Sequence, residues 1–135
     1  MSVAGEVVSA SGAGLVILLG VGEEDGVAEA ERLAGKIARL RVFEDDEGRL
    51  DRSLLDVRGA ALVVSQFTLL ADSQLRKGTR PDFSKAAPRD TAEPIYERFC
   101  EALRDLGVPV QTGVFGARMV VTIVNDGPVT LVLDA

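Results

Sequence analysis

The segment Ala60-Ala61-Leu62-Val63-Val64-Ser65-Gln66-Phe67 is the strongest strand signal in the chain. Its apolar and β-branched interior is typical of a buried strand, and its polar residues stand at the carboxyl end. A buried strand that ends in polar residues is a common place for a functional site. The segment therefore predicts a strand of the main sheet and the position of a candidate site.

Two strands and a helix are expected on the amino-terminal side. Glu6 to Ala10 is short and β-branched, residues 11–14 form a glycine-containing turn, and Leu15 to Leu19 is a continuous apolar run. Such a run suits a strand that is covered on both faces. Apolar residues at helical spacing then predict a helix from Asp25, its cap, to about Leu40.

A second helix and three strands are expected on the carboxyl-terminal side. The helix ends at Leu106, and its start is ambiguous: Asp90 with Glu93 resembles a capping box, but Pro94 as the first helical residue is the simpler reading. The expected strands are Val110 to Phe115, Met119 to Val124 and Val129 to Leu133. Strands outnumber helices and do not alternate with them, which predicts an α+β fold: a mixed β-sheet with two main helices packed on it, in a single domain over 1–135.

Composition excludes several classes of chemistry. Among 135 residues, 15 Lys and Arg stand against 21 Asp and Glu, and this net charge of −6 argues against a protein that coats a nucleic-acid duplex. There is no histidine and only one cysteine, Cys100, so triads and dyads with histidine, His-ligated zinc and an intramolecular disulfide are excluded. No signal peptide or membrane-spanning run is apparent, and we expect a cytoplasmic protein.

The acidic run Glu44-Asp45-Asp46-Glu47-Gly48 is a candidate cation loop. It lacks the alternating ligand spacing of an EF-hand, and charged blocks of this kind usually lie in water. We expect a solvated turn and no metal site.

Ser65-Gln66-Phe67-Thr68, at the end of the central strand, is the first of two segments that carry chemistry. Ser65 or Thr68 could act as a nucleophile, but each would need an activating base. The alternative is that both are ordinary hydroxyls at the end of a strand.

The second segment is Asn125-Asp126-Gly127-Pro128-Val129-Thr130. A hairpin turn is the simplest interpretation of this composition. A cis peptide between Gly127 and Pro128 is the alternative, and it would aim neighbouring carbonyl oxygens outward as a pair of acceptors for an ammonium group.

Taken together and in this order, the two segments resemble the D-aminoacyl-tRNA deacylase family. Other stretches along essentially the whole chain share the resemblance: Val3-x-Gly5-Glu6-Val7, Leu15 to Val21, Arg41-Val42-Phe43-Glu44-Asp45, Ser53-Leu54-Leu55-Asp56-Val57, Arg76-Lys77-Gly78, Arg80-Pro81-x-Phe83 and Gly113-x-Phe115-Gly116-Ala117.

The resemblance implies a homodimeric esterase that cleaves the bond between a D-amino acid, or glycine, and the terminal adenosine of tRNA. The carbonyl oxygens of Gly127 and Pro128, cis in the family, would reach into the partner's pocket and hold the α-amino group, with Asn125 and Thr130 in the same binding segment. An L side chain would clash there.

The opposite wall would be the catalytic segment Ser65, Gln66, Phe67 and Thr68. Its backbone N–H groups would anchor the adenosine or polarise the ester carbonyl. The resemblance implies a role for the tRNA 2′-hydroxyl in the chemistry, with Thr68 as the competing nucleophile. Because the chain has no histidine and one cysteine, we expect no metal or other cofactor.

The partner implied is the acceptor end of aminoacyl-tRNA, rather than DNA or a membrane. Arg76, Lys77 and Arg80 are the best candidates for phosphate contacts, and a solvated loop is the alternative.

One departure concerns the amino terminus. The family begins with a further strand that carries a Gln-Arg pair, whose arginine braces the Gly-Pro loop, whereas this sequence starts at Met1-Ser2-Val3. Either the start of the sequence is misassigned or the strand is missing, and in the sequence as given its arginine has no obvious substitute. A non-catalytic module that binds aminoacyl-tRNA, or an inactive truncated homologue that keeps only the fold, is therefore the alternative function.

Overall fold

The computed structural model describes residues 2–3, 6–7, 14–72 and 78–135. Its centre is a parallel sheet of three strands in the order β3-β6-β7, with β3 at Gly14–Leu19, β6 at Ala60–Ser65 and β7 at Val110–Thr112. Gly14 pairs with Ala60 and Leu19 with Ser65, so β3 and β6 stay in register over their whole length. The strongest predicted strand is thus the middle strand of this sheet.

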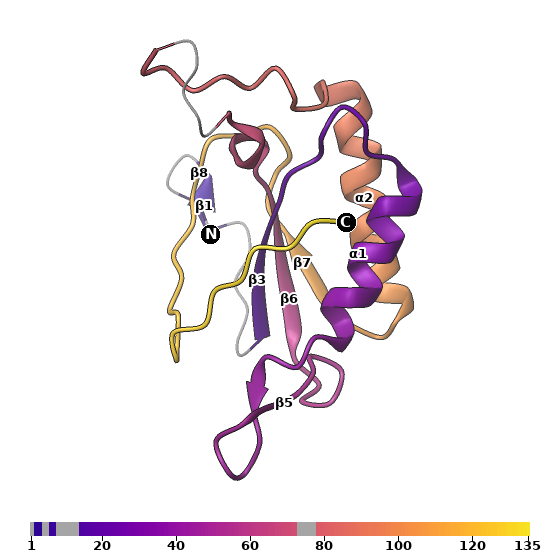
Figure 1. Cartoon of the computed structure of the whole chain (residues 1–135), viewed down its shortest axis with the longest axis vertical. Coiled ribbons are helices and arrows are strands. Elements are labelled where there is room, and N and C mark those ends of the chain that lie inside the picture. Colours follow the sequence, from indigo (N-terminus) through magenta and orange to yellow (C-terminus); the bar gives the residue numbers. More distant parts are fainter. Residues whose placement is uncertain (1, 4–5, 8–13, 73–77) are drawn as a thin grey trace.

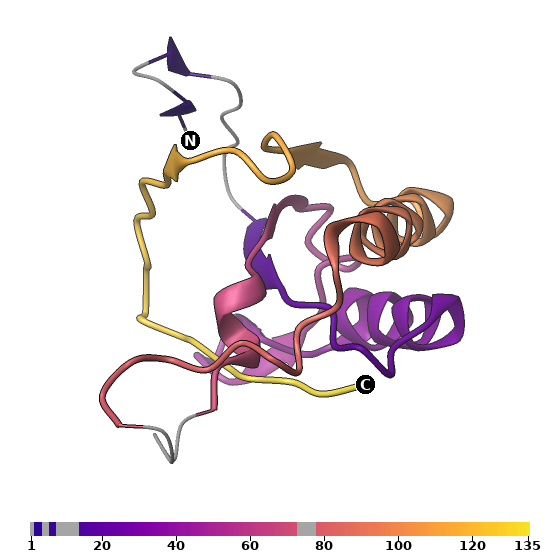
Figure 2. The same cartoon turned by 90° about the horizontal axis from the view of Figure 1, so that it is seen from above.

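Both helices lie on one face of this sheet (Figures 1 and 2). Helix α1, Val27–Arg39, connects β3 toward β6, and α2, Arg89–Asp105, connects β6 to β7. Crossovers between parallel strands share one hand, so strands added in sequence order place both helices on the same side. The main core lies between the helices and the sheet, with Leu54, Val63, Phe99 and Leu103 among its fully or almost fully buried side chains.

The predicted helices form, but their starts differ from expectation. Helix α1 begins after Gly26, whose N–H donates to Glu29 Oε2 at 2.9 Å, whereas the Asp25 carboxylate accepts from the N–H of Gly22 at 2.8 Å. Asp25 therefore closes the preceding turn instead of capping the helix.

The prediction that α2 starts at Pro94 is wrong. Pro88 is the N-cap and Pro94 lies inside the helix. The Pro88 carbonyl accepts from the N–H groups of Thr91 and Ala92, at 3.0 and 2.9 Å, which closes a full turn before Pro94 is reached. Burial of Ala92 anchors that first turn, whereas Pro94 lies on the exposed side of the helix.

The face of the sheet away from the helices has a smaller core. Leu62 and Val64 are buried there against Met119 and Val121. Strand β8, Met119–Val120, belongs to an antiparallel sheet of order β2-β1-β8 with β1, Ser2–Val3, and β2, Glu6–Val7. The expectation that Leu15 to Leu19 is covered on both faces is wrong for the single chain, because Val16 is 36% and Leu18 is 42% exposed.

Several predicted strands are shorter in the structure. The central strand ends at Ser65, the strand from Val110 ends at Thr112, the strand from Met119 ends at Val120, and residues 129–133 form no strand. A segment with β-branched residues forms a strand only where another strand pairs with it. Residues 121–135 pair with no strand among the described residues. The first predicted strand is seen only as Glu6–Val7, and its residues 8–10 and the turn at 11–13 lie outside the described residues.

The acidic run is a turn, as predicted, between β4, Phe43–Glu44, and β5, Leu50–Arg52. Asp45 Oδ1 accepts from the N–H groups of Glu47 and Arg49, at 2.8 and 2.9 Å. The bond from Arg49 is the main cause that lowers the pKa of Asp45. The carboxylate thus shapes the turn itself.

Candidate functional site

The segment Ser65 to Thr68 leaves the sheet at the carboxyl end of β6. Gln66 follows the last paired residue, and its N–H donates to the Leu19 carbonyl at 2.8 Å, which ties the segment to the end of β3. Phe67 then opens a short 3₁₀ helix, η1, at Phe67–Leu70. This tight turn replaces the last part of the predicted strand and presents Phe67 and Thr68 at the surface.

Gly20 lies directly behind this turn. A Cβ on Gly20 would meet Leu70 Cδ2 at 2.5 Å, the Gln66 carbonyl oxygen at 3.1 Å and Leu69 Cβ at 3.2 Å. The end of β3 therefore lies so close to η1 that a Cβ at position 20 would force at least one of these atoms to move. Sequence reasoning did not assign this role to Gly20, although a glycine that follows a buried strand is a signal for close backbone approach.

Phe67 forms an apolar wall beside the segment. Its side chain is 56% exposed, and its ring meets that of Phe83 edge to face, with centroids 5.0 Å apart. Leu69 next to it is 55% exposed. The pair of rings is a surface on which a planar base could stack.

The Thr68 hydroxyl has an amide as its neighbour, because Gln66 Nε2 donates to Thr68 Oγ1. A neutral carboxamide cannot take a proton from a hydroxyl at neutral pH, so this contact orients Thr68 without activating it as a nucleophile. The arrangement is better suited to binding through backbone N–H groups than to covalent catalysis.

The second segment forms a loop that its own side chains close. Asn125 Nδ2 donates to Thr130 Oγ1 at 2.9 Å, and the N–H of Val129 donates to Asn125 Oδ1 at 3.3 Å. The Gly127–Pro128 peptide is cis, which confirms that alternative of the sequence prediction. Gly127 has φ +135°, and a Cβ there would lie 3.1 Å from Val129 Cγ2. Asn125 and Thr130 thus hold the shape of the loop that carries the two carbonyl groups.

Within one chain the two segments do not meet. In Figure 1, η1 lies near the top of the sheet, whereas the loop of residues 125–130, in yellow, lies at the lower left. Residues 125–130 are all exposed. The predicted pairing of the two segments is therefore not formed within one chain.

The predicted basic residues are only partly described. Arg76 and Lys77 lie outside the described residues, and Arg80 is exposed. Sequence reasoning missed Arg89, whose guanidinium lies 5.9 Å from the centroid of the Phe115 ring and pairs with Glu93 at 3.6 Å. A positive charge is thereby fixed beside the loop that follows β7.

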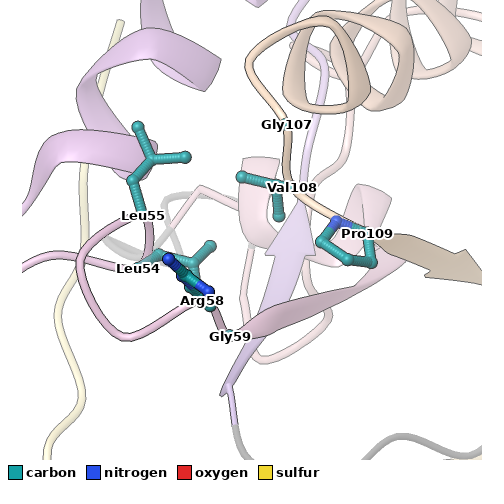
Figure 3. Close-up of a pocket in the computed structure, with 7 residues that line it drawn as sticks. All are labelled: Leu54, Leu55, Arg58, Gly59, Gly107, Val108 and Pro109. Atoms are coloured by element: carbon teal, nitrogen blue, oxygen red, sulfur yellow. The ribbon is translucent and has the colours of Figure 1, made fainter.

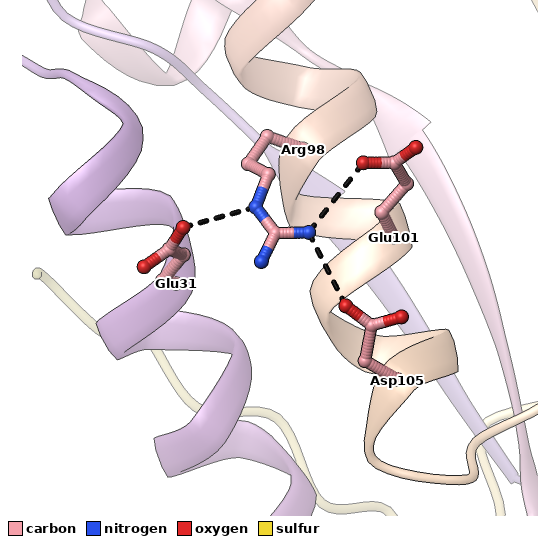
Figure 4. A network of polar contacts seen from close by, with 4 residues as sticks. All are labelled: Glu31, Arg98, Glu101 and Asp105. Carbon is pink, nitrogen blue, oxygen red and sulfur yellow. Dashed lines mark hydrogen bonds and ion pairs between the residues drawn. The ribbon is translucent and has the colours of Figure 1, made fainter.

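Two hollows of the described surface lie away from these segments. One, of about 210 Å³, lies at the opposite end of β6 and is lined by Leu54, Leu55, Arg58, Gly59, Gly107, Val108 and Pro109 (Figure 3). The other lies between α1 and α2, where Arg98 pairs with Glu31, Glu101 and Asp105 at 3.0, 3.4 and 3.3 Å (Figure 4). Neither contains a residue of the two predicted segments.

Within the described ranges, no group of three or more His, Cys, Asp and Glu residues is arranged to hold a metal ion. Among the same residues, no helix is long and apolar enough to cross a membrane.

The chain combines a parallel βαβαβ core with two exposed segments: a turn at the end of the middle strand and a Gly-Pro loop. The model of the D-Tyr-tRNA(Tyr) deacylase family matches residues 1–134. The chain belongs to this family.

Individual relatives agree. The chain is 58% identical over 135 residues to a D-aminoacyl-tRNA deacylase of Thermomicrobium roseum, covering 100% of this chain and 86% of the relative. It is likewise 58% identical to one of Thermus aquaticus, covering 100% and 88%. A solved structure titled "c-Myc DNA Unwinding Element Binding Protein" superposes with a TM-score of 0.91 at 44% identity and covers 99% of this chain and 90% of that one.

Proposed function

We propose that this protein hydrolyses the ester bond of D-aminoacyl-tRNA, including glycyl-tRNA mischarged on the wrong tRNA, and releases the free amino acid and the tRNA. The observation that carries the proposal is the full-length match to relatives named D-aminoacyl-tRNA deacylase, over a chain that retains both the Ser65–Thr68 segment and the Gly127-Pro128 loop. The reaction belongs to translation and hence to the cytoplasm.

The site is built from two copies of the chain. The loop of one subunit enters the space in front of Ser65 to Thr68 of the other, where the carbonyl oxygens of Gly127 and Pro128 accept hydrogen bonds from the substrate's α-ammonium group. Support comes from the exposure of the loop, from its distance from η1 within one chain, and from the uncovered Val16 and Leu18. An L side chain would point into the loop, so chirality is selected by exclusion.

The opposite wall binds the ester and the adenosine. N–H groups of the Ser65–Thr68 turn stabilise the oxyanion that forms when water attacks the ester carbonyl. The acyl carbon–oxygen bond then breaks, the ribose oxygen takes a proton, and the amino acid leaves as its carboxylate. The 2′-hydroxyl of the tRNA assists, and no metal or cofactor takes part.

The tRNA is held only at its acceptor end, with Arg76, Lys77 and Arg80 against phosphates. A short contact of this kind needs few positive charges, which fits a chain of net charge −6. The proposed partner is neither DNA nor a membrane.

The decisive experiment compares hydrolysis of D-aminoacyl-tRNA with that of the matching L-aminoacyl-tRNA. We expect turnover of the D form and sparing of the L form. Equal rates on both would refute selection by the loop. A folded protein that binds the D form without turnover would instead be a non-catalytic aminoacyl-tRNA-binding module.

A Thr68→Ala variant separates two mechanisms in the same assay. If backbone and substrate groups carry the chemistry, the variant keeps much of the activity, because only a hydroxyl held by Gln66 is lost. Loss of turnover with unchanged affinity would identify Thr68 as the nucleophile.

A further inference from the structure

We infer that Tyr96 is a positioning residue that aims the Ser65–Thr68 turn at the substrate, an inference that rests on the proposed function. Tyr96 lies on α2, is 5% exposed, and donates a hydrogen bond from its hydroxyl to the Val63 carbonyl oxygen at 2.7 Å. A buried tyrosine needs a partner for its hydroxyl, and here that partner is the backbone of the strand that leads into the candidate site.

The Val63 carbonyl lies where the pairing between β6 and β7 ends. Val63 is the last residue of β6 that pairs with β7, opposite Thr112, whereas β3 remains paired with β6 as far as Ser65. Beyond Val63, β6 is therefore no longer paired with β7. The Tyr96 hydroxyl binds the strand at the point where pairing with β7 ends, two residues before Ser65.

The turn is thus held from two sides. On the β3 side, the N–H of Gln66 donates to the Leu19 carbonyl at 2.8 Å. On the β7 side, the Tyr96 hydroxyl holds the carbonyl of Val63. The two bonds flank Ser65 in sequence and lie on opposite edges of β6, so together they fix the direction in which the chain leaves the sheet.

Tyr96 itself is fixed by its surroundings. Its ring lies 5.4 Å from that of Phe115, centroid to centroid, and the Arg89 guanidinium covers the Phe115 ring. Burial raises the pKa of the Tyr96 hydroxyl, so the group stays protonated and remains a donor. The chain of contacts runs from the first turns of α2 through two aromatic rings to the backbone of the candidate site.

Backbone N–H groups stabilise a transition state only when they are held in place before the reaction begins. A turn that loses one of two anchors samples more orientations, which lowers the rate of the chemical step more than it weakens substrate binding. That distinction separates positioning from a purely structural role.

The test is a Tyr96→Phe variant, which keeps the ring and deletes the hydroxyl. We expect kcat for D-aminoacyl-tRNA to fall about tenfold while KM changes less than about twofold. The matched control is Ile37→Val on α1, a buried change in the same core, assayed at a temperature where both variants are fully folded. An unchanged kcat in Tyr96→Phe, or an equal fall in Ile37→Val, would overturn the inference.

A second measurement does not depend on activity. Amide hydrogen exchange at Gln66 should be faster in Tyr96→Phe than in the parent protein and unchanged in Ile37→Val. If the parent protein hydrolyses no D-aminoacyl-tRNA yet Gln66 exchanges faster in the tyrosine variant, the proposed function fails and the anchoring by Tyr96 stands. Unchanged exchange at Gln66 would show that Tyr96 does not hold the turn.

Discussion

Single residues in this protein carry functions that their chemical type alone does not reveal. Asn125 and Thr130 were expected to bind substrate, yet their side chains bond to each other across the loop and shape its backbone. Their proposed contribution to binding is therefore indirect, through the orientation of two neighbouring carbonyl groups. This pattern suits a chain without histidine, for which we propose that backbone groups bind the substrate.

Gly127 gives the first residue-scale prediction. Gly127→Ala should lower kcat/KM for D-aminoacyl-tRNA at least about tenfold, because a φ of +135° strains any other residue and the new Cβ would lie 3.1 Å from Val129 Cγ2. Steady-state kinetics with D and L substrates measures the effect. Gly48→Ala is the matched control, since Gly48 also has a positive φ, +81°, but open space around it and a position in the acidic turn. A similar kinetic loss in both variants would contradict the argument.

At the scale of elements, the contact between the end of β3 and η1 leaves no room for a side chain at Gly20. Gly20→Ala should displace η1 by a few tenths of an ångström, because Leu70 can rotate away but the Gln66 carbonyl and Leu69 Cβ cannot. We expect a stability loss of about 1–3 kcal/mol and reduced turnover. Chemical denaturation and kinetics measure the two effects.

The control for that variant is another glycine replaced by alanine. Gly35 lies within α1, where a Cβ would meet only Arg39 Nη1 at 3.5 Å. Gly35→Ala should stabilise the protein by about 0.5–1 kcal/mol, because alanine is the better helix former. If Gly20→Ala were as stable and active as Gly35→Ala, the close approach would have no consequence.

The start of α1 predicts a dependence on pH. Hydrogen bonds from the backbone N–H groups of Glu29 itself and of Gly26 lower the pKa of the Glu29 carboxyl. A carboxyl whose pKa is lower in the folded state contributes stability that is present above the unfolded pKa, about 4.3, and is lost as the pH falls through the folded value. The denaturation midpoint should therefore decrease as the pH is lowered below about 4.3. The decrease should be less steep in Glu29→Gln than in the parent protein. An identical slope in both proteins would contradict this origin.

Sequence patterns correctly predicted the helices, whose signal is local. They were less successful for strands and contacts that depend on residues far away in the sequence. The apolar residues Ile95, Phe99 and Leu103 specify α2 because helical periodicity is local, and all three are buried. By contrast, the stretch Val129 to Leu133 reads as a strand but pairs with none of the described residues. The bond from Tyr96 to Val63 spans 33 positions, so no local pattern could indicate it.

At the scale of the whole molecule, the fold leaves one face incomplete. Sequential parallel strands place both helices on a single side, and on the other side Val16 and Leu18 remain exposed in the single chain. The loop of residues 125–130 is exposed as well. We expect a dimer of the 14.3 kDa chain in solution, with a two-fold axis that brings each loop to the partner's η1.

Mixing two inactive variants tests whether the site crosses subunits. Gly127→Val deforms the loop, because both its positive φ and the nearby Val129 oppose a branched side chain. Phe67→Pro removes a backbone N–H from the opposite wall at the first position of η1, where proline fits a helix.

Each homodimer should be inactive, since each of its sites carries one defect. In a mixed dimer, one site combines the intact loop with the intact wall and the other carries both defects. Unfolding and refolding an equal mixture makes about half of the dimers mixed, so roughly a quarter of the parent activity should return. If the site lies within one chain, or if the protein acts as a monomer, the refolded mixture should recover no activity.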